Sequence, residues 1–246
     1  LAQIGATAAL YSLITNVAFG LNNGFALFVS RNFGADNKIE MKRSVCWAVL
    51  LSAISTILLT TSFLVFRRPL LTLLQVPADT MDGALSYLTV ILAGIPLTMA
   101  YNLESSLLRS IGNSVTPLIF LVFSSMLNVI LDYLFMGPFS MGVRGAAIAT
   151  VTSQGISAVL GLFCIMKGYP ELRFGKQDMK VSIHFVFEMF WTGLSMALMS
   201  AIYNIGSVIL QGSINALGNV YIAAQVGGRR LAAVSYTHLT LPTNRE

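Results

Sequence analysis

The stretch PLIFLVFSSMLNVILDYLFM, residues Pro117–Met136, decides the class of this protein. It is almost wholly apolar and carries one charged side chain, Asp132. An α-helix rises 1.5 Å per residue, so about 20 such residues cross a hydrocarbon core about 30 Å thick. The stretch therefore predicts a membrane-spanning helix.

Other stretches of the chain have the same length and character. They are Ala6–Ser30, Ser44–Phe66, Ala84–Leu108, Gly145–Met166 and His184–Gln211, and a further apolar run begins near Val220. None alternates between apolar and polar residues as the strands of a membrane barrel do, and only helices or closed barrels satisfy the backbone in lipid. The sequence predicts an all-α integral membrane protein, a polytopic helix bundle.

Proline marks two places along these spans. Pro96 falls inside the third span and predicts a kink there, because proline lacks the amide hydrogen that an inner helical turn needs. Thr116 before Pro117 predicts a helix start, with the threonine as the cap and the proline at the first helical position.

The composition agrees with a membrane protein. Of the 246 residues, 55% are hydrophobic and 10% are charged, whereas about a quarter of the residues of an ordinary soluble domain are charged. The net charge of +5 comes from cations in short segments between the spans, where they act as orientation signals. We therefore expect the lipid bilayer, and no nucleic acid, as a partner.

The segments between successive spans lie on alternate sides of the membrane, and the Lys and Arg residues fall unequally on these two sides. Nine lie on one side: Arg31, Lys38, Lys42, Arg43, Arg109, Lys167, Arg173, Lys176 and Lys180. Three lie on the other: Arg67, Arg68 and Arg144. Because cytoplasmic segments collect Lys and Arg, the first set is predicted to be cytoplasmic, in a multi-pass protein of the cell's inner (plasma) membrane.

Cysteine and histidine are too scattered for catalysis or for a metal centre. Cys46 and Cys164 lie in different apolar runs, and His184 and His238 have no partner close in sequence. A zinc site or a nucleophile with its base needs several such side chains together. We expect no enzymatic activity and no cofactor.

Both ends of the sequence suggest a piece of a longer protein. The chain begins at Leu1 rather than at a methionine, and the apolar run from Val220 gives way to a polar segment containing Pro242. Residues 234–246, VSYTHLTLPTNRE, resemble translated sequencing read-through, and a native polar tail is the alternative. We expect a fragment whose last residues are not native.

Asp132 is the first candidate for function, because a carboxylate inside a span is costly and is kept mainly where it faces protein, water or an ion. Asn128 lies one turn earlier on the same helix face, and Thr150 and Gln154 follow on the next span. Oxygen atoms of these types are ligands for a hard cation such as Na⁺, and a carboxylate can also carry a proton. The alternative is a buried aspartate that bonds to neighbouring Asn and Ser side chains for packing.

Further polar side chains inside the spans are candidates for cavity or substrate contacts. They are Glu104 and Asn102 on the third span, Gln154, and Tyr203 with Asn204 on the last full span. Glu104 has the alternative role of a locally satisfied side chain near the cytoplasmic end. GLNNG, Gly20–Gly24, predicts close helix packing through its GxxxG spacing.

Four motifs resemble the multidrug and toxic-compound extrusion (MATE) family in order and spacing. They are FGADN at Phe33–Asn37, SLLRSIGNSVTPL at Ser106–Leu118, SSMLNVILDYLF at Ser124–Phe135 and GVRGAAIATVTSQ at Gly142–Gln154. The resemblance covers about residues 1–233. It implies two bundles of six helices around a central cleft, with residues 1–182 as the amino-terminal bundle without its first helix and 183–233 as the start of the second bundle.

The resemblance also implies a function. Proteins of this family export cationic, amphipathic compounds in exchange for H⁺ or Na⁺, and the family pattern matches at Asn128, Asp132 and Thr150, which makes these the expected cation-coupling residues. Asp132 would be the ligand if the ion is Na⁺. Small organic cations are the expected substrates, and no obligatory protein partner is evident.

Two other functions are compatible with a membrane bundle. A lipid-linked oligosaccharide flippase of the same superfamily needs Arg or Lys facing its cavity to hold a pyrophosphate, whereas these spans carry acids. A non-transporting membrane subunit has no reason to keep Asp132 and Asn128 within a span. The sequence therefore favours the antiporter.

Overall fold

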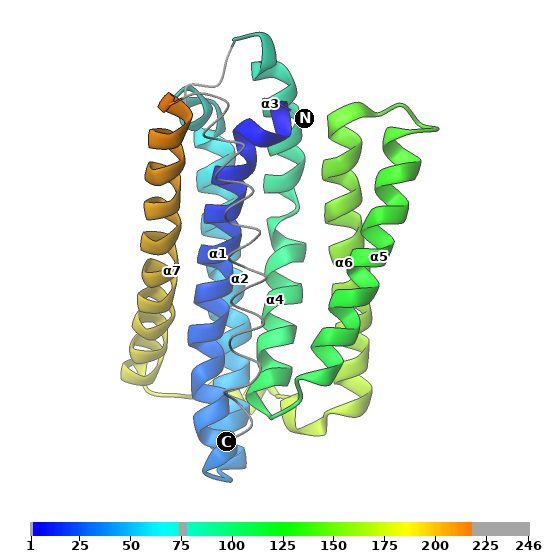
Figure 1. Ribbon diagram of the computed structural model, residues 1–246. Helices are drawn as coiled ribbons and strands as arrows, with labels where there is room; N and C mark the ends of the chain where they lie inside the picture. Colours follow the sequence, from blue (N-terminus) through cyan, green and yellow to red (C-terminus); the bar gives the residue numbers. More distant parts are fainter. Residues whose placement is uncertain (1, 74–77, 218–246) are drawn as a thin grey trace, which may run out of the picture. The chain divides into compact units, whose positions relative to one another are not determined.

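The computed structural model describes residues 2–73 and 78–217 of the chain. Within them lie seven α-helices, two short 3₁₀ helices and no strand (Figure 1). The α-helices are α1 (Ala2–Gly34), α2 (Lys38–Leu73), α3 (Ala78–Ala93), α4 (Ile95–Ser110), α5 (Val115–Met136), α6 (Gly142–Gly168) and α7 (Ile183–Leu217). The 3₁₀ helices η1 (Pro170–Leu172) and η2 (Lys176–Met179) lie in the segment between α6 and α7.

Five of the six predicted spans are confirmed by α1, α2, α5, α6 and α7, which are long and apolar enough to cross a membrane. The third predicted span corresponds to α3 and α4, which meet the same criteria together as a pair bent by 45°. The expected run near Val220 lies outside the described residues, as do residues 234–246.

The bend between α3 and α4 confirms the kink predicted at Pro96. Gly94 separates the two helices, and Pro96 stands at the start of α4. A Cβ atom at Gly94 would lie 2.3 Å from a methyl carbon of Val151 in α6. The bend therefore needs a proline that lacks an amide hydrogen and a glycine that lets α6 approach the backbone.

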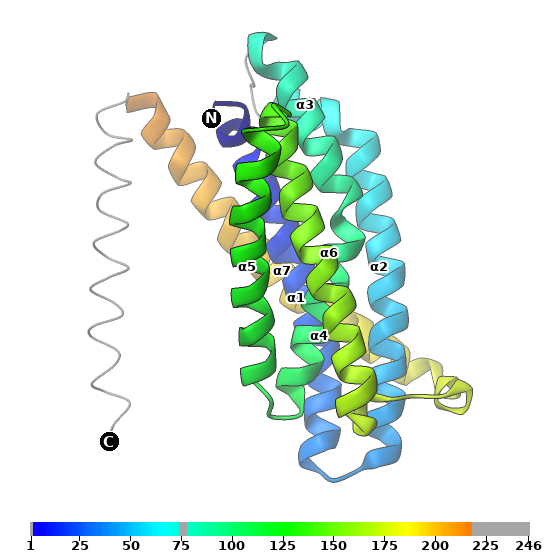
Figure 2. The ribbon, with the colours of Figure 1, turned by 90° about the vertical axis from the view of Figure 1, so that its right-hand side faces the viewer.

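The chain forms two compact units, Leu1–Ala201 and Ile202–Glu246. In the first unit, α1 packs against α2, α3 and α4, while α6 packs against α3, α4 and α5. Figures 1 and 2 both show α5 and α6 as neighbouring helices. The expected boundary between bundles after residue 182 stays a prediction.

Close packing between α1 and α7 confirms the expectation for GLNNG. A Cβ atom at Gly20 would lie 2.7 Å from the Ala197 Cα atom, and one at Gly24 would lie 2.4 Å from the Gly193 Cα atom. Small residues on both helices thus let the two backbones approach, as in other membrane helix pairs.

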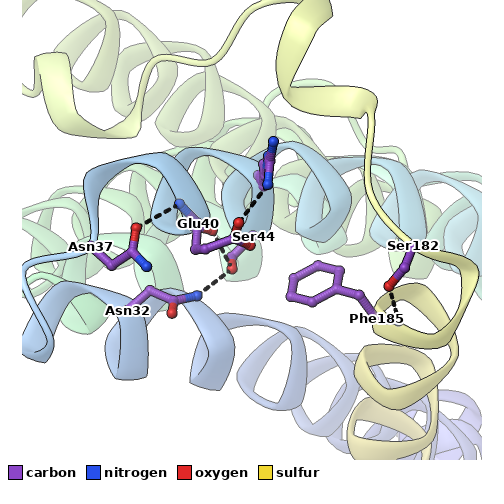
Figure 3. A network of polar contacts seen from close by, with 7 residues as sticks. Asn32, Asn37, Glu40, Ser44, Ser182 and Phe185 are labelled. Atoms are coloured by element: carbon purple, nitrogen blue, oxygen red, sulfur yellow. Dashed lines mark hydrogen bonds and ion pairs between the residues drawn. The ribbon is translucent and has the colours of Figure 1, made fainter.

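The corner between α1 and α2 explains the FGADN motif. Asp36 has a positive φ of 51°, and Asn37 caps α2 by accepting the Glu40 amide hydrogen at 3.2 Å. Asn32 donates to the Ser44 hydroxyl at 2.9 Å, which joins the two helices across the turn (Figure 3). Asp36 is tolerated here because aspartate adopts left-handed conformations more readily than most residues.

The segment between α6 and α7 is fastened to α2. Trp47 donates its indole hydrogen to the Met179 carbonyl at 3.2 Å, and the buried Asp178 accepts the Gly175 amide hydrogen at 2.7 Å. At its end, Ser182 accepts the Phe185 amide hydrogen at the start of α7 (Figure 3). The segment that carries Arg173, Lys176 and Lys180 is therefore ordered on the bundle.

Candidate functional site

Asn128 and Thr150 meet where α5 lies against α6. The Asn128 side-chain amide donates to the Thr150 hydroxyl at 3.4 Å, and that hydroxyl donates to the Ala146 carbonyl at 3.0 Å. Helices that are joined by a short turn run antiparallel and adjacent, so the turn after Met136 brings these residues together. The structure thus joins two of the three predicted coupling residues directly.

Asp132, the third, lies one helical turn beyond Asn128. Its Oδ1 atom is buried and has no hydrogen-bond partner among the described residues. No bond between Asp132 and Asn128 or Ser124 occurs in the described structure. The alternative role of Asp132, a buried side chain that bonds to neighbouring Asn and Ser for packing, requires contacts that are not present around this oxygen.

A tyrosine side chain lies within electrostatic range of the same carboxylate. Tyr87 of α3 is only 8% exposed, and it lies close enough to Asp132 and to Tyr11 of α1 for electrostatic interaction. Tyr87 packs with Ile91 and Ala147, and Tyr11 borders this cluster. The charge of Asp132 therefore acts on Tyr87 of α3, and its cost in an apolar environment is high unless a cation or proton neutralises it.

The polar residues of α6 have different partners on the neighbouring helices. Gln154 accepts a hydrogen bond from the Thr98 hydroxyl of α4 at 2.5 Å, and the fully buried Ser157 hydroxyl has no partner among the described residues. Among the described bonds, Thr150 is the one of the three that bonds to α5. Spacings of four and three residues keep the three side chains on one side of α6, and the role of Gln154 stays a prediction.

Glu104 occupies a different level of the bundle. Its carboxylate lies against Gly161 of α6, where a Cβ atom would come within 2.3 Å of Oε2. Gly161 is eleven residues from Thr150, which places the two levels about 16 Å apart along α6. Glu104 and Asp132 are therefore separate acids rather than a pair.

Arg109 is not the partner of Glu104. The guanidinium lies over the Phe19 ring at 5.7 Å from its centroid and donates to the Ser106 hydroxyl at 3.2 Å. This agrees with the five-residue spacing, which turns the two side chains away from each other.

The remaining candidates are less fully placed. Asn102 of α4 and Asn204 of α7 are half-buried, and the Tyr203 side chain lies outside the described residues. Asn204 belongs to the second compact unit. Contacts of Tyr203 and Asn204 with a substrate or a cavity therefore stay predictions.

A buried polar connection was missed by sequence reasoning. Asn22 of α1 is fully buried, donates to the Met99 carbonyl of α4 at 3.0 Å and accepts from the Ser52 hydroxyl of α2 at 2.8 Å. Its neighbour Asn23 accepts from Ser106 at 2.8 Å. The pair of asparagines within an apolar span was the signal, because such groups need partners in lipid.

Comparisons with known proteins agree with this architecture. The MatE family model matches residues 1–134. The probable multidrug resistance protein YpnP of Bacillus subtilis is 32% identical over 85% of this chain. An FAD transporter of Shewanella oneidensis is 29% identical over 68% of the chain.

The chain spans about half the length of YpnP, 50%, and 38% of the FAD transporter. A solved structure of a MOP superfamily transporter from Pyrococcus furiosus superposes on 95% of this chain and 52% of its own, with a TM-score of 0.85 and 23% identity. At that identity the likeness supports the fold alone. With five membrane-spanning helices and one bent helix pair among its described residues, the four motifs and a family match over more than half its length, this chain belongs to the MatE family of multidrug transporters and is a multi-pass membrane protein.

Proposed function

We propose that the full-length protein carrying this sequence is a secondary active antiporter that exports cationic, amphipathic compounds in exchange for H⁺ or Na⁺. The observation that carries the proposal is the Asp132 oxygen, which is buried without a hydrogen-bond partner beside the bonded pair Asn128 and Thr150. Family membership supports a transporter, and the acid supports coupling to a cation.

Each residue of the site has a distinct role in this proposal. Asp132 takes up the proton, or supplies the negative charge that holds Na⁺. The Asn128 side-chain oxygen is available as a ligand, because its amide nitrogen makes the bond to Thr150. The Thr150 hydroxyl offers a further oxygen and fixes the Asn128 side chain, and hard cations bind such oxygen ligands. The protein needs no other cofactor in this scheme.

The coupling between ion binding and substrate release follows from thermodynamic linkage. An antiporter needs a site whose free energy depends on the driving ion and differs between its two conformations. Neutralising Asp132 removes the cost of a buried charge, so ion binding favours the conformation in which the carboxylate is most enclosed. Occupancy of Asp132 then controls the release of the organic cation.

The charges of the described spans favour a cationic substrate. Asp132 and Glu104 lie within the spans, and the described Lys and Arg side chains lie at helix ends or in the connecting segments. The protein would act in the plasma membrane with small organic cations as substrates, without nucleic acid or an obligatory protein partner. Because one of the relatives is an FAD transporter, transport of an organic anion must be compared with transport of an organic cation.

The test is gradient-driven efflux of a fluorescent organic cation from vesicles that contain the full-length protein. Asp132→Asn keeps the side-chain shape and removes the charge, so the variant should insert normally and lose ion-driven transport. Asp82→Asn is the matched control, because Asp82 is exposed, and it should transport like wild type.

Two further arms complete this test. Replacing the proton gradient by a sodium gradient identifies the ion, and a fluorescent organic anion tests the charge preference. Wild-type efflux by Asp132→Asn, or faster export of the anion than of the cation, would contradict the proposal.

A further inference from the structure

A second polar site lies at the end of the helix bundle opposite to the end that carries most of the Lys and Arg residues. A cavity of about 410 Å³ is bordered by two arginines at the end of α2, one arginine at the start of α6 and one face of α3. Its lining residues are Arg67, Arg68, Arg144, Leu85, Ser86, Thr89 and Val90. We call this cavity the arginine pocket.

The arginine pocket gathers all three cations that the charge count places on this side of the membrane. Arg67 and Arg68 are far from Arg144 in sequence, and orientation signals need only lie in the right segment. Like charges that share a cavity repel one another. Their convergence therefore makes the cavity favourable for a negatively charged group.

That group is not a carboxylate of the described part of the chain. Among the described side chains, the ion pair present is that of Arg43 with Glu40. None of the three arginines forms an ion pair with a described side chain. Arg67 donates through one nitrogen to the Leu64 carbonyl at 2.9 Å, which fixes its position and leaves its other donors available. Arg67 is thus held in place with unused hydrogen-bond donors.

The chemistry of the lining suits a phosphate group. The planar guanidinium group presents paired donors that match phosphate oxygens. Arg144 lies in the first turn of α6, where free amide hydrogens and the helix dipole also favour an anion. The Ser86 hydroxyl is exposed and lines the same cavity.

We propose that the arginine pocket binds the phosphate of an anionic lipid headgroup in the adjoining leaflet. A lipid is favoured over free phosphate because Val65 and Phe66, directly before the two arginines in α2, are 72% and 58% exposed. These side chains offer an apolar surface for acyl chains beside the pocket. The site is separate from Asp132 and does not depend on the proposed transport function.

The test measures retention of phosphatidylglycerol by the full-length protein in lipid nanodiscs, using native mass spectrometry. Wild type should retain phosphatidylglycerol in preference to phosphatidylcholine. Replacing Arg67, Arg68 and Arg144 by Gln should lower that preference by about tenfold or more, because charge-assisted bonds to phosphate are lost. Topology should persist, since the removed charges oppose the orientation signal.

A control variant loses the same charge elsewhere. Lys38, Lys176 and Lys180 are exposed, and replacing all three by Gln should leave the preference near the wild-type value. Equal loss in both variants would overturn the proposal in favour of general charge attraction. Retention unchanged in the arginine variant would also overturn it.

A competition arm separates the two sources of phosphate. Inorganic phosphate or glycerol phosphate in excess should displace little lipid from wild type, whereas displacement at equal concentration would overturn the lipid assignment.

A triple Arg→Lys variant keeps the charge and tests for misfolding. The Lys variant should retain more phosphatidylglycerol than the Gln variant. If the Lys variant retains as little phosphatidylglycerol as the Gln variant while its thermal unfolding temperature is unaltered, a role for charge is contradicted.

Discussion

At the scale of single residues, the balance between Asp132 and its surroundings determines the chemistry that the bundle can perform. The Oδ1 atom is buried without a partner, while Asn128 is engaged with Thr150. The sequence was sufficient to single out these residues, because an acid within a span is costly and a spacing of four places Asn128 on the same face. The unpaired oxygen could not be predicted, since it depends on which neighbour each amide and hydroxyl selects.

Thr150→Val tests the second ligand. Valine has nearly the same shape and lacks the hydroxyl that accepts from Asn128 at 3.4 Å, so Asn128 loses its anchor and the ion loses an oxygen. We expect the coupling-ion concentration for half-maximal efflux to rise roughly fivefold, the effect of about one hydrogen bond.

Thr61→Val is the matched control for this measurement, because the exposed Thr61 hydroxyl bonds only to carbonyls of its own helix. It should leave the ion dependence unchanged. If Thr150→Val has the same ion dependence as this control, Thr150 is not part of the ion site.

At the scale of helices, long apolar runs predicted the spans correctly and their ends less well. α2 continues past Phe66 through Arg67, Arg68 and Pro69 to Leu73, because a helix can extend beyond the hydrocarbon core. α5 begins at Val115, so the start expected at Thr116 and Pro117 was wrong. The side chain of Asn113, the residue before the cap residue Ser114, accepts the Thr116 amide hydrogen at 3.0 Å.

Gly24→Ala tests the contact between α1 and α7. The added methyl group would meet backbone atoms of Gly193 at 2.4 Å, which cannot move as a side-chain end can. Overpacking of this kind should lower the free energy of unfolding by about 1–3 kcal/mol, measured as a lower thermal unfolding temperature in detergent.

Gly34→Ala provides the comparison, because nothing lies within 4 Å of a Cβ atom there. It should unfold near the wild-type temperature. Equal stability of the two variants would show that α1 and α7 are not in close contact in the protein.

At the scale of the whole molecule, charge distribution gives the bundle its direction. The cations on either side of the turn between α1 and α2, at the end of α4 and in the segment after α6 belong to one end, and the three arginines of the arginine pocket belong to the other. Counting charges predicts which end is cytoplasmic. It could not predict that the three arginines share one cavity, because this depends on how α2, α3 and α6 pack.

Cysteine accessibility tests this orientation in a variant without Cys46 and Cys164. Single cysteines at Ala35 and Gln177, both exposed, should react with an impermeant reagent only from the cytoplasmic side. A cysteine at Phe139, which is exposed between α5 and α6, should react only from outside. The reverse pattern would overturn the topology.

The central claim is that Asp132 holds the coupling ion and gives it up when the substrate binds. The most direct measurement is ion release on addition of an organic cation to the purified full-length protein, as protons in weakly buffered detergent solution or as labelled sodium. Wild type should release ions in proportion to bound substrate, and Asp132→Asn should release none. Release from Asp132→Asn equal to that from wild type would contradict the claim.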